Sequence, residues 1–299
     1  MGIKKLKIGV VILIFLIISI FIVLVVKNQY LNNFNLQDMV VFVDDYDNNL
    51  IEQPEYSEEI EKIKYECNEK ATPIREEFSD FIDSCNLIII DYFKDVYDVD
   101  VTSKINAIEI LEVIYPENVS RMIGGTYSKD FPNTVFLFSD FLDNFIEEEK
   151  VDDLDIRSRD FSIKMFRNVY LHLAIHNLGF KSDYVFYNVT EAIDEYFIQQ
   201  ILVHNDIKYE RMSDYYEIRN YVAKFVGVDM DFVREVLNNE VVMSEYFNNK
   251  FEDLSDVNYA WCYEKLIGLI RNGDVKDLNK VKHYTKLLID EYCRMIKMK

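Results

Sequence analysis

Two histidines four residues apart are the side chains of this chain best suited to chemistry. His172 and His176 lie in the strongly apolar segment 160–178, and the whole sequence contains only four histidines. In an α-helix this spacing places both imidazoles on one face, one turn apart, where two nitrogens can reach a single Zn²⁺. A buried imidazole needs a polar partner, so a pair on one buried helix indicates a shared ligand. The pair therefore predicts a metal site.

A carboxylate for this site is available on the next helical segment, residues 190–204. Glu191 lies in its first turn, and Glu195 follows one turn later on the same face. In a metal site, Glu191 would bind the ion and Glu195 would orient a ligand histidine through its other ring N–H. Two alternatives stay open. Asn188 and Glu191 fit a capping box, in which Glu191 only accepts a backbone N–H, and the histidines can be core residues bonded to carboxylates without a metal.

Both segments resemble those of a known enzyme family, the gluzincin or thermolysin-like zinc metallopeptidases. YLHLAIHNLG at 170–179 resembles their HExxH helix, and TEAIDEY at 190–196 resembles their NEAxxEY or NEAxxD segment. NTVFLFS at 133–139 resembles the edge strand that precedes the zinc helix and pairs with bound peptide. The resemblance covers about residues 110–255. It implies a zincin-like domain with a peptide-binding cleft.

The resemblance implies that His172, His176 and Glu191 bind Zn²⁺ and that Glu195 stands behind them. The chain departs from the family pattern at the residue after the first histidine. That residue should be the glutamate that acts as general base on the attacking water, and here it is Leu173. General-base catalysis is worth about 10²–10⁴-fold in rate, so the resemblance implies impaired catalysis.

No other residue clearly replaces the missing base. Asp194 follows Glu191 by three positions and is the nearest candidate, and His204 and Tyr215 are candidates for the groups that stabilise the transition state in the family. Three functions follow from these residues. The first is a zinc-binding but catalytically impaired homologue that binds a protein or peptide in the cleft. The alternatives are an active zinc metallopeptidase with an atypical base, and a metal-free structural ectodomain.

The N-terminal part of the sequence predicts a membrane anchor. Residues 8–26 contain no charge and are long enough to cross a bilayer as a helix. Three lysines precede the stretch and Lys27 follows it, a bias that places the N-terminus in the cytoplasm. A cleaved signal peptide fits less well, because the run is long and no small-residue cleavage site follows. We therefore expect a cytoplasmic tail at 1–7, a transmembrane anchor at 8–26, a linker at 27–56 and an extracytoplasmic domain at 57–299 of a single-pass cell-membrane protein.

Composition restricts the fold and the partners of that domain. The formal charge is −20, and the four lysines of residues 1–27 leave the remainder at −24, so nucleic acid is excluded as a partner by charge repulsion. Gly (8) and Pro (4) are scarce, which favours helices. We expect an α+β, predominantly helical fold in which a small antiparallel sheet is followed by a C-terminal helical bundle. The apolar segment 160–178 should be a buried helix, capped by Asp160 or Ser162 and ended by Gly179.

Overall fold

The computed structural model describes residues 71–114, 124–127, 133–148, 154–180, 187–209 and 219–239, with a few single positions and one short stretch elsewhere. The expected tail 1–7, anchor 8–26 and linker 27–56 lie outside the described residues. The sequence also predicts helices at 57–71, 257–271 and 276–297, and most of these residues lie outside the described part of the chain.

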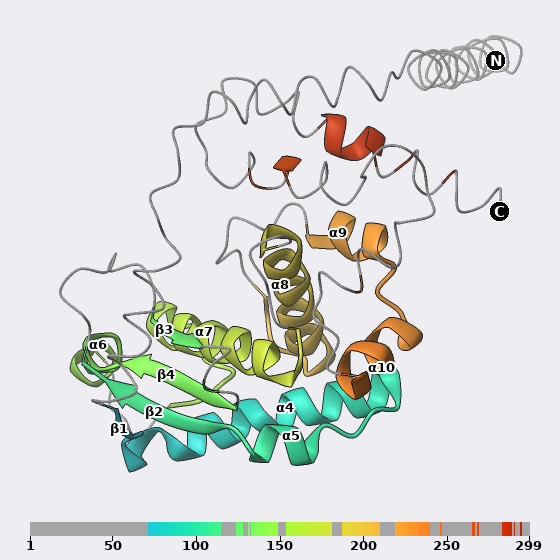
Figure 1. Cartoon of the computed structure of the whole chain (residues 1–299). Helices are drawn as coiled ribbons and strands as arrows, with labels where there is room; N and C mark the ends of the chain where they lie inside the picture. Colours follow the sequence, from blue (N-terminus) through green and yellow to red (C-terminus); the bar gives the residue numbers. More distant parts are fainter. Residues whose placement is uncertain are drawn as a thin grey trace, which may run out of the picture.

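A four-stranded sheet forms one side of the described domain (Figure 1). The strands are β1 (Thr72–Pro73), β2 (Glu109–Val113), β3 (Gly125–Tyr127) and β4 (Thr134–Phe138), in the spatial order β1-β2-β4-β3. β4 is paired on both sides, antiparallel to β3 and parallel to β2, and all five of its residues are buried. A strand that is buried on both faces reads as a continuous apolar run, as TVFLF does.

The expected fold class needs a correction. The sequence also predicts two strands that pair, at 122–127 and 133–139, and the pairing of β3 with β4 confirms them. The sheet is mixed rather than antiparallel, because β2 runs parallel to β4. β3 runs opposite to β2, and the chain then turns again, so β4 runs in the same direction as β2. The expected edge strand at 133–139 is wrong for the same reason: β4 is internal, and β3 is the strand beyond it.

The expected transmembrane helix is not part of the fold that the structure describes. None of the helices built from the described residues is both long enough and apolar enough to cross a membrane. The observed fold class is a mostly helical domain with a small mixed sheet.

Eight helical elements surround or extend the sheet among the described residues between 76 and 239. They are η1 (Glu76–Phe78), α4 (Ser79–Tyr97), α5 (Thr102–Asn106), α6 (Ser139–Glu148), α7 (Phe161–Leu178), α8 (Tyr187–His204), α9 (Arg219–Val226) and α10 (Met230–Asn239). Figure 1 shows α7 between the sheet and α8, with α4 and α5 running beneath them. α7 contacts β3, β4, α4, α5, α6 and α8, which makes it the central helix of the described fold.

The local sequence explains where α7 begins and ends. The Asp160 carboxylate accepts a hydrogen bond of 2.9 Å from the backbone N–H of Ser162, as an N-cap residue should. Gly179 ends the helix at φ 132°, a conformation that L side chains rarely adopt. A Cβ at this position would also lie 3.3 Å from the Val236 carbonyl oxygen of α10. The prediction of a buried, capped helix at 160–178 is confirmed.

Lys104 of α5 ties the end of α7 to the end of α10. Its ammonium donates hydrogen bonds to the Leu237 carbonyl at 2.6 Å and the Leu178 carbonyl at 3.4 Å, both in the last turns of their helices. A cation there satisfies orphan carbonyls and opposes the negative end of two helix dipoles. Lys104→Met should therefore lower the free energy of unfolding by about 1–3 kcal/mol in urea denaturation. Lys94→Met, at an exposed lysine in the last turn of α4, is the control, and equal losses in both variants would refute this role.

Candidate metal centre

α7 brings the two histidines together as the spacing predicts. The Nε2 atoms of His172 and His176 are 3.1 Å apart, and the two rings are nearly perpendicular. The side chain of His176 is fully buried, whereas that of His172 is 29% exposed. The candidate site therefore has a closed side at His176 and a side that reaches the surface at His172.

A backbone carbonyl fixes the orientation of the His176 ring. The Nδ1 atom lies 2.8 Å from the carbonyl oxygen of Phe180, just beyond the Gly179 turn. A carbonyl oxygen can only accept, so Nδ1 carries the hydrogen and Nε2 keeps its lone pair when the ring is neutral. Metal-binding histidines are held in this way by an acceptor on the far ring nitrogen. Sequence reasoning missed this contact, because a backbone carbonyl leaves no signal in residue type.

His172 is also prepared to act as a neutral ligand. Loss of hydration lowers the pKa of His172 to about 4; the nearby His176 lowers this pKa as well, whereas Glu191 opposes the shift. Metal binding requires a deprotonated imidazole. His172 is therefore in its ligand form at neutral pH.

Glu191 of α8 spans both imidazoles. Its Oε1 lies 3.3 Å from Nε2 of His176, and its Oε2 lies 3.4 Å from Nε2 of His172. Glu191 follows the first turn of α8, which spans Tyr187–His204. The structure thus brings together the three residues that the resemblance implies as zinc ligands.

Asp194 is the fourth group of this cluster. It follows Glu191 by three positions on the same face of α8, and its Oδ2 lies 3.1 Å from Nε2 of His176. His172, His176 and Asp194 offer ligand atoms that all lie within 4.8 Å of one another. The Asp194 side chain is fully buried, and among the described residues neither of its oxygens has a hydrogen-bond partner. Burial raises the pKa of Asp194 well above its usual range, Glu191 and Glu195 raise it further, and His176 opposes them.

The remaining predicted residues have other surroundings. The Glu195 carboxylate accepts a hydrogen bond from the Tyr209 hydroxyl and is close enough to Asp194 to raise its pKa, while the far ring nitrogen of His176 is held by the Phe180 carbonyl. His204 lies thirteen residues beyond Glu191 in the same helix, about 20 Å along its axis, and contacts Asp95. The structure does not bring His204 to the cluster. Tyr215 lies outside the described residues.

Leu173, where the resemblance to gluzincins implies a catalytic glutamate, packs into the protein. It is 4% exposed and lies against β3, since a Cβ placed on Gly125 would come within 2.8 Å of its Cδ1. The surroundings of the two histidines are therefore apolar on the side that faces the sheet.

The donor set fits a zinc ion. Two imidazoles and two carboxylates are nitrogen and oxygen ligands of the kind that Zn²⁺ accepts, and no thiol is involved. A buried carboxylate without a hydrogen-bond partner, as in Asp194, is costly unless a cation compensates it.

Cys85 is not part of this cluster. It lies on the buried side of α4, where burial raises the pKa of its thiol, so the thiol is unreactive.

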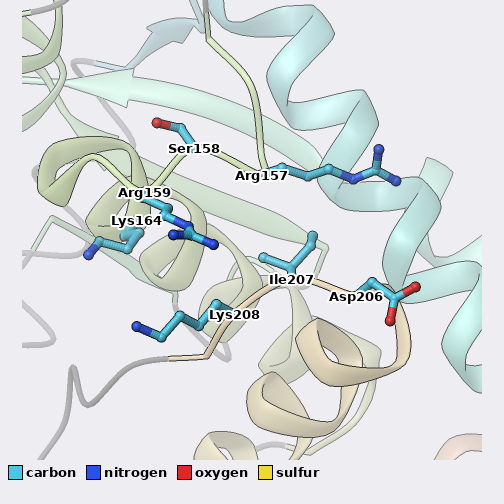
Figure 2. Close-up of a pocket in the computed structure, with 7 residues that line it drawn as sticks. All are labelled: Arg157, Ser158, Arg159, Lys164, Asp206, Ile207 and Lys208. Carbon is cyan, nitrogen blue, oxygen red and sulfur yellow. The ribbon is translucent and has the colours of Figure 1, made fainter.

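A pocket at the start of α7 does not fit a metal ion. It has a volume of about 110 Å³ and is lined by Arg157, Ser158, Arg159, Lys164, Asp206, Ile207 and Lys208. Figure 2 shows Arg159, Lys164 and Lys208 grouped together, with Arg157 extending away from them. Four cations against one carboxylate repel a positive ion, so this pocket is not part of the candidate metal centre.

In comparisons with known proteins, the chain matches no protein-family model, no curated protein and no solved structure. Any assignment of a function therefore depends on the geometry of this site. The resemblance to gluzincins rests on the residues of α7 and α8 and stays a prediction.

Proposed function

We propose that this chain is a gluzincin-like protein that binds one zinc ion through His172, His176 and Glu191 and does not cleave peptides. The observation that carries the proposal is the position of Glu191, which sets one carboxylate oxygen against each imidazole Nε2 at 3.3 and 3.4 Å. The Phe180 carbonyl supports it, because it turns the lone pair of His176 toward the same point.

The absence of peptidase activity follows from the residue beside the first ligand. With three protein ligands, a zinc ion would keep a coordination position at which it could polarise a carbonyl group as a Lewis acid. Leu173 can neither accept the proton of an attacking water nor pass it to the leaving amine, and it is packed against β3. Amide cleavage without this proton transfer loses about 10²–10⁴-fold in rate. The protein would bind a protein or peptide ligand without cleaving its peptide bonds.

Zinc titration of the metal-free full chain tests the proposal. Glu191→Ala should weaken zinc binding by about 100-fold or more, because it removes a ligand and leaves the two imidazoles without their shared carboxylate. Glu235→Ala is the control: it removes the same kind of side chain at an exposed position of α10 and should leave the affinity near that of the wild type. Isothermal titration calorimetry with a competing chelator measures both.

Two outcomes would contradict the proposal. Equal zinc affinity in the wild type and Glu191→Ala would remove Glu191 from the site. Hydrolysis of a peptide substrate by the wild type, abolished both by a chelator and by His172→Ala, would favour the second candidate, an active metallopeptidase. The observation that favours this candidate is the 29% exposure of the His172 side chain, and Asp194 would be the first residue to test as its base.

A further inference from the structure

We infer that Asp194 is a fourth protein ligand of the zinc ion and takes the position that a catalytic zinc site keeps for water or substrate. The inference rests on the proposed function, because it requires that His172, His176 and Glu191 bind zinc. It changes the nature of the site: the ion would join α7 to α8 as a structural element and would have no open coordination position.

The distances within the cluster support four ligands. Ligand atoms about 2.0–2.1 Å from a tetrahedral zinc ion are separated from one another by about 3.3–3.4 Å. In the structure, Nε2 of His176 lies 3.1 Å from Nε2 of His172, 3.3 Å from Glu191 and 3.1 Å from Asp194. The separation of Glu191 from His172 is 3.4 Å. His172, His176 and Glu191 thus lie at the spacing of a common coordination sphere, and Asp194 has this spacing to His176 and lies within 4.8 Å of the ligand atom of His172.

The contact between Asp194 and His176 requires a cation, either a bound proton or a metal ion, between the two facing atoms. Nε2 of a neutral His176 carries no hydrogen, because the ring hydrogen lies on Nδ1 and is donated to Phe180. A carboxylate oxygen and a nitrogen lone pair therefore face each other at 3.1 Å in a fully buried place. Without a proton on one of them such a pair repels, and Asp194 has no hydrogen-bond partner among the described residues. A metal ion between the two atoms turns the repulsion into coordination.

A closed coordination sphere also accounts for the residue beside it. A zinc ion with four protein ligands activates no water, so it has no use for a general base, and an apolar Leu173 that packs against β3 is suited to a structural site. The two departures from the family pattern, an extra carboxylate and a missing base, have one explanation.

Cobalt substitution tests the fourth ligand directly. The visible absorption of the Co²⁺-loaded full chain reports ligand number, and azide binds to Co²⁺ only where a position is open. We expect that azide leaves the wild-type spectrum unchanged, and that Asp194→Ala binds Co²⁺ at least about tenfold more weakly and gains a response to azide. A wild-type spectrum that responds to azide, or an Asp194→Ala spectrum and affinity identical to the wild type, would overturn the inference.

A change of sign in thermal stability gives a second test, in a variant that keeps the side-chain shape. Asp194→Asn should raise the melting temperature of the metal-free chain by about 2–4 °C, because it removes a buried, unpartnered carboxylate. It should lower the melting temperature of the zinc-saturated chain, because it removes a charged ligand. Asp95→Asn, at an exposed aspartate that contacts His204, should change both states alike.

The two proposals fail in different ways. Shifts of the same sign in both states of Asp194→Asn, with zinc binding still dependent on Glu191, would overturn the fourth ligand and leave the proposed function intact. A wild-type chain that binds neither Zn²⁺ nor Co²⁺ would overturn both.

Discussion

Replacing His176 by alanine should reduce the zinc affinity of the full chain by about 10³-fold or more. Binding of a structural zinc ion releases roughly 10–16 kcal/mol, so one of four ligands accounts for several kcal/mol. His176 is the residue whose loss should cost most, because its Nε2 lies within 3.3 Å of His172, Glu191 and Asp194, and its ring is already oriented by Phe180. Competition with a chelator of known affinity measures the loss.

The ranking of the histidine variants makes this prediction specific. His172→Ala should weaken zinc binding less than His176→Ala, because its side chain is 29% exposed and water can fill the vacated position. His204→Ala is the control, since this histidine contacts Asp95 about 20 Å along α8 from Glu191 and should not affect the affinity. Equal effects of His176→Ala and His204→Ala would show that the cluster holds no metal.

Leu173→Glu should destabilise the protein by about 3 kcal/mol or more without creating a peptidase. The side chain is 4% exposed and packs against Gly125 of β3, so the new carboxylate would be buried. A buried carboxylate either loses its hydration or takes up a proton, and both cost free energy. Since Asp194 would occupy the fourth coordination position, no attacking water is held for the new base to activate. Urea denaturation and a peptide-cleavage assay measure the two parts of this prediction.

Two control variants separate the causes. Leu173→Met keeps an apolar side chain of similar volume and should cost less than about 1.5 kcal/mol. Val203→Glu introduces the same carboxylate at an exposed position of α8 and should change stability by about 0.5 kcal/mol or less. Peptide cleavage by Leu173→Glu that is lost again in Leu173→Glu/His176→Ala would show that the coordination sphere has an open position, against the role of Asp194.

The helices of the described domain were largely predictable because their signals are local. Asp160, the apolar run and Gly179 define α7 within twenty residues, and the structure begins and ends the helix there. The sheet was not predictable in the same way. β2 and β4 pair across more than twenty residues, and no local pattern distinguishes a parallel neighbour from an antiparallel one. The expectation of an edge strand at 133–139 came from the family resemblance, which does not specify the neighbours of β4 in this chain.

In the candidate site, too, local contacts were predictable and contacts between distant segments were not. Helical spacing alone places His172 beside His176, and the resemblance adds Glu191, which the structure brings to both rings. The position of Asp194 depends on the angle at which α7 and α8 cross, which sequence does not specify. Its spacing of three from Glu191 was a usable signal, since residues three apart share a helix face.

The zinc content of the full chain, purified under zinc-replete conditions without chelators, tests the central claim most directly. Metal analysis by mass spectrometry should find about one zinc ion per chain, and chelation should remove it and lower the melting temperature. A zinc-free chain whose melting temperature is the same with and without a chelator would contradict the account, and would leave His172, His176, Glu191 and Asp194 as a metal-free buried cluster.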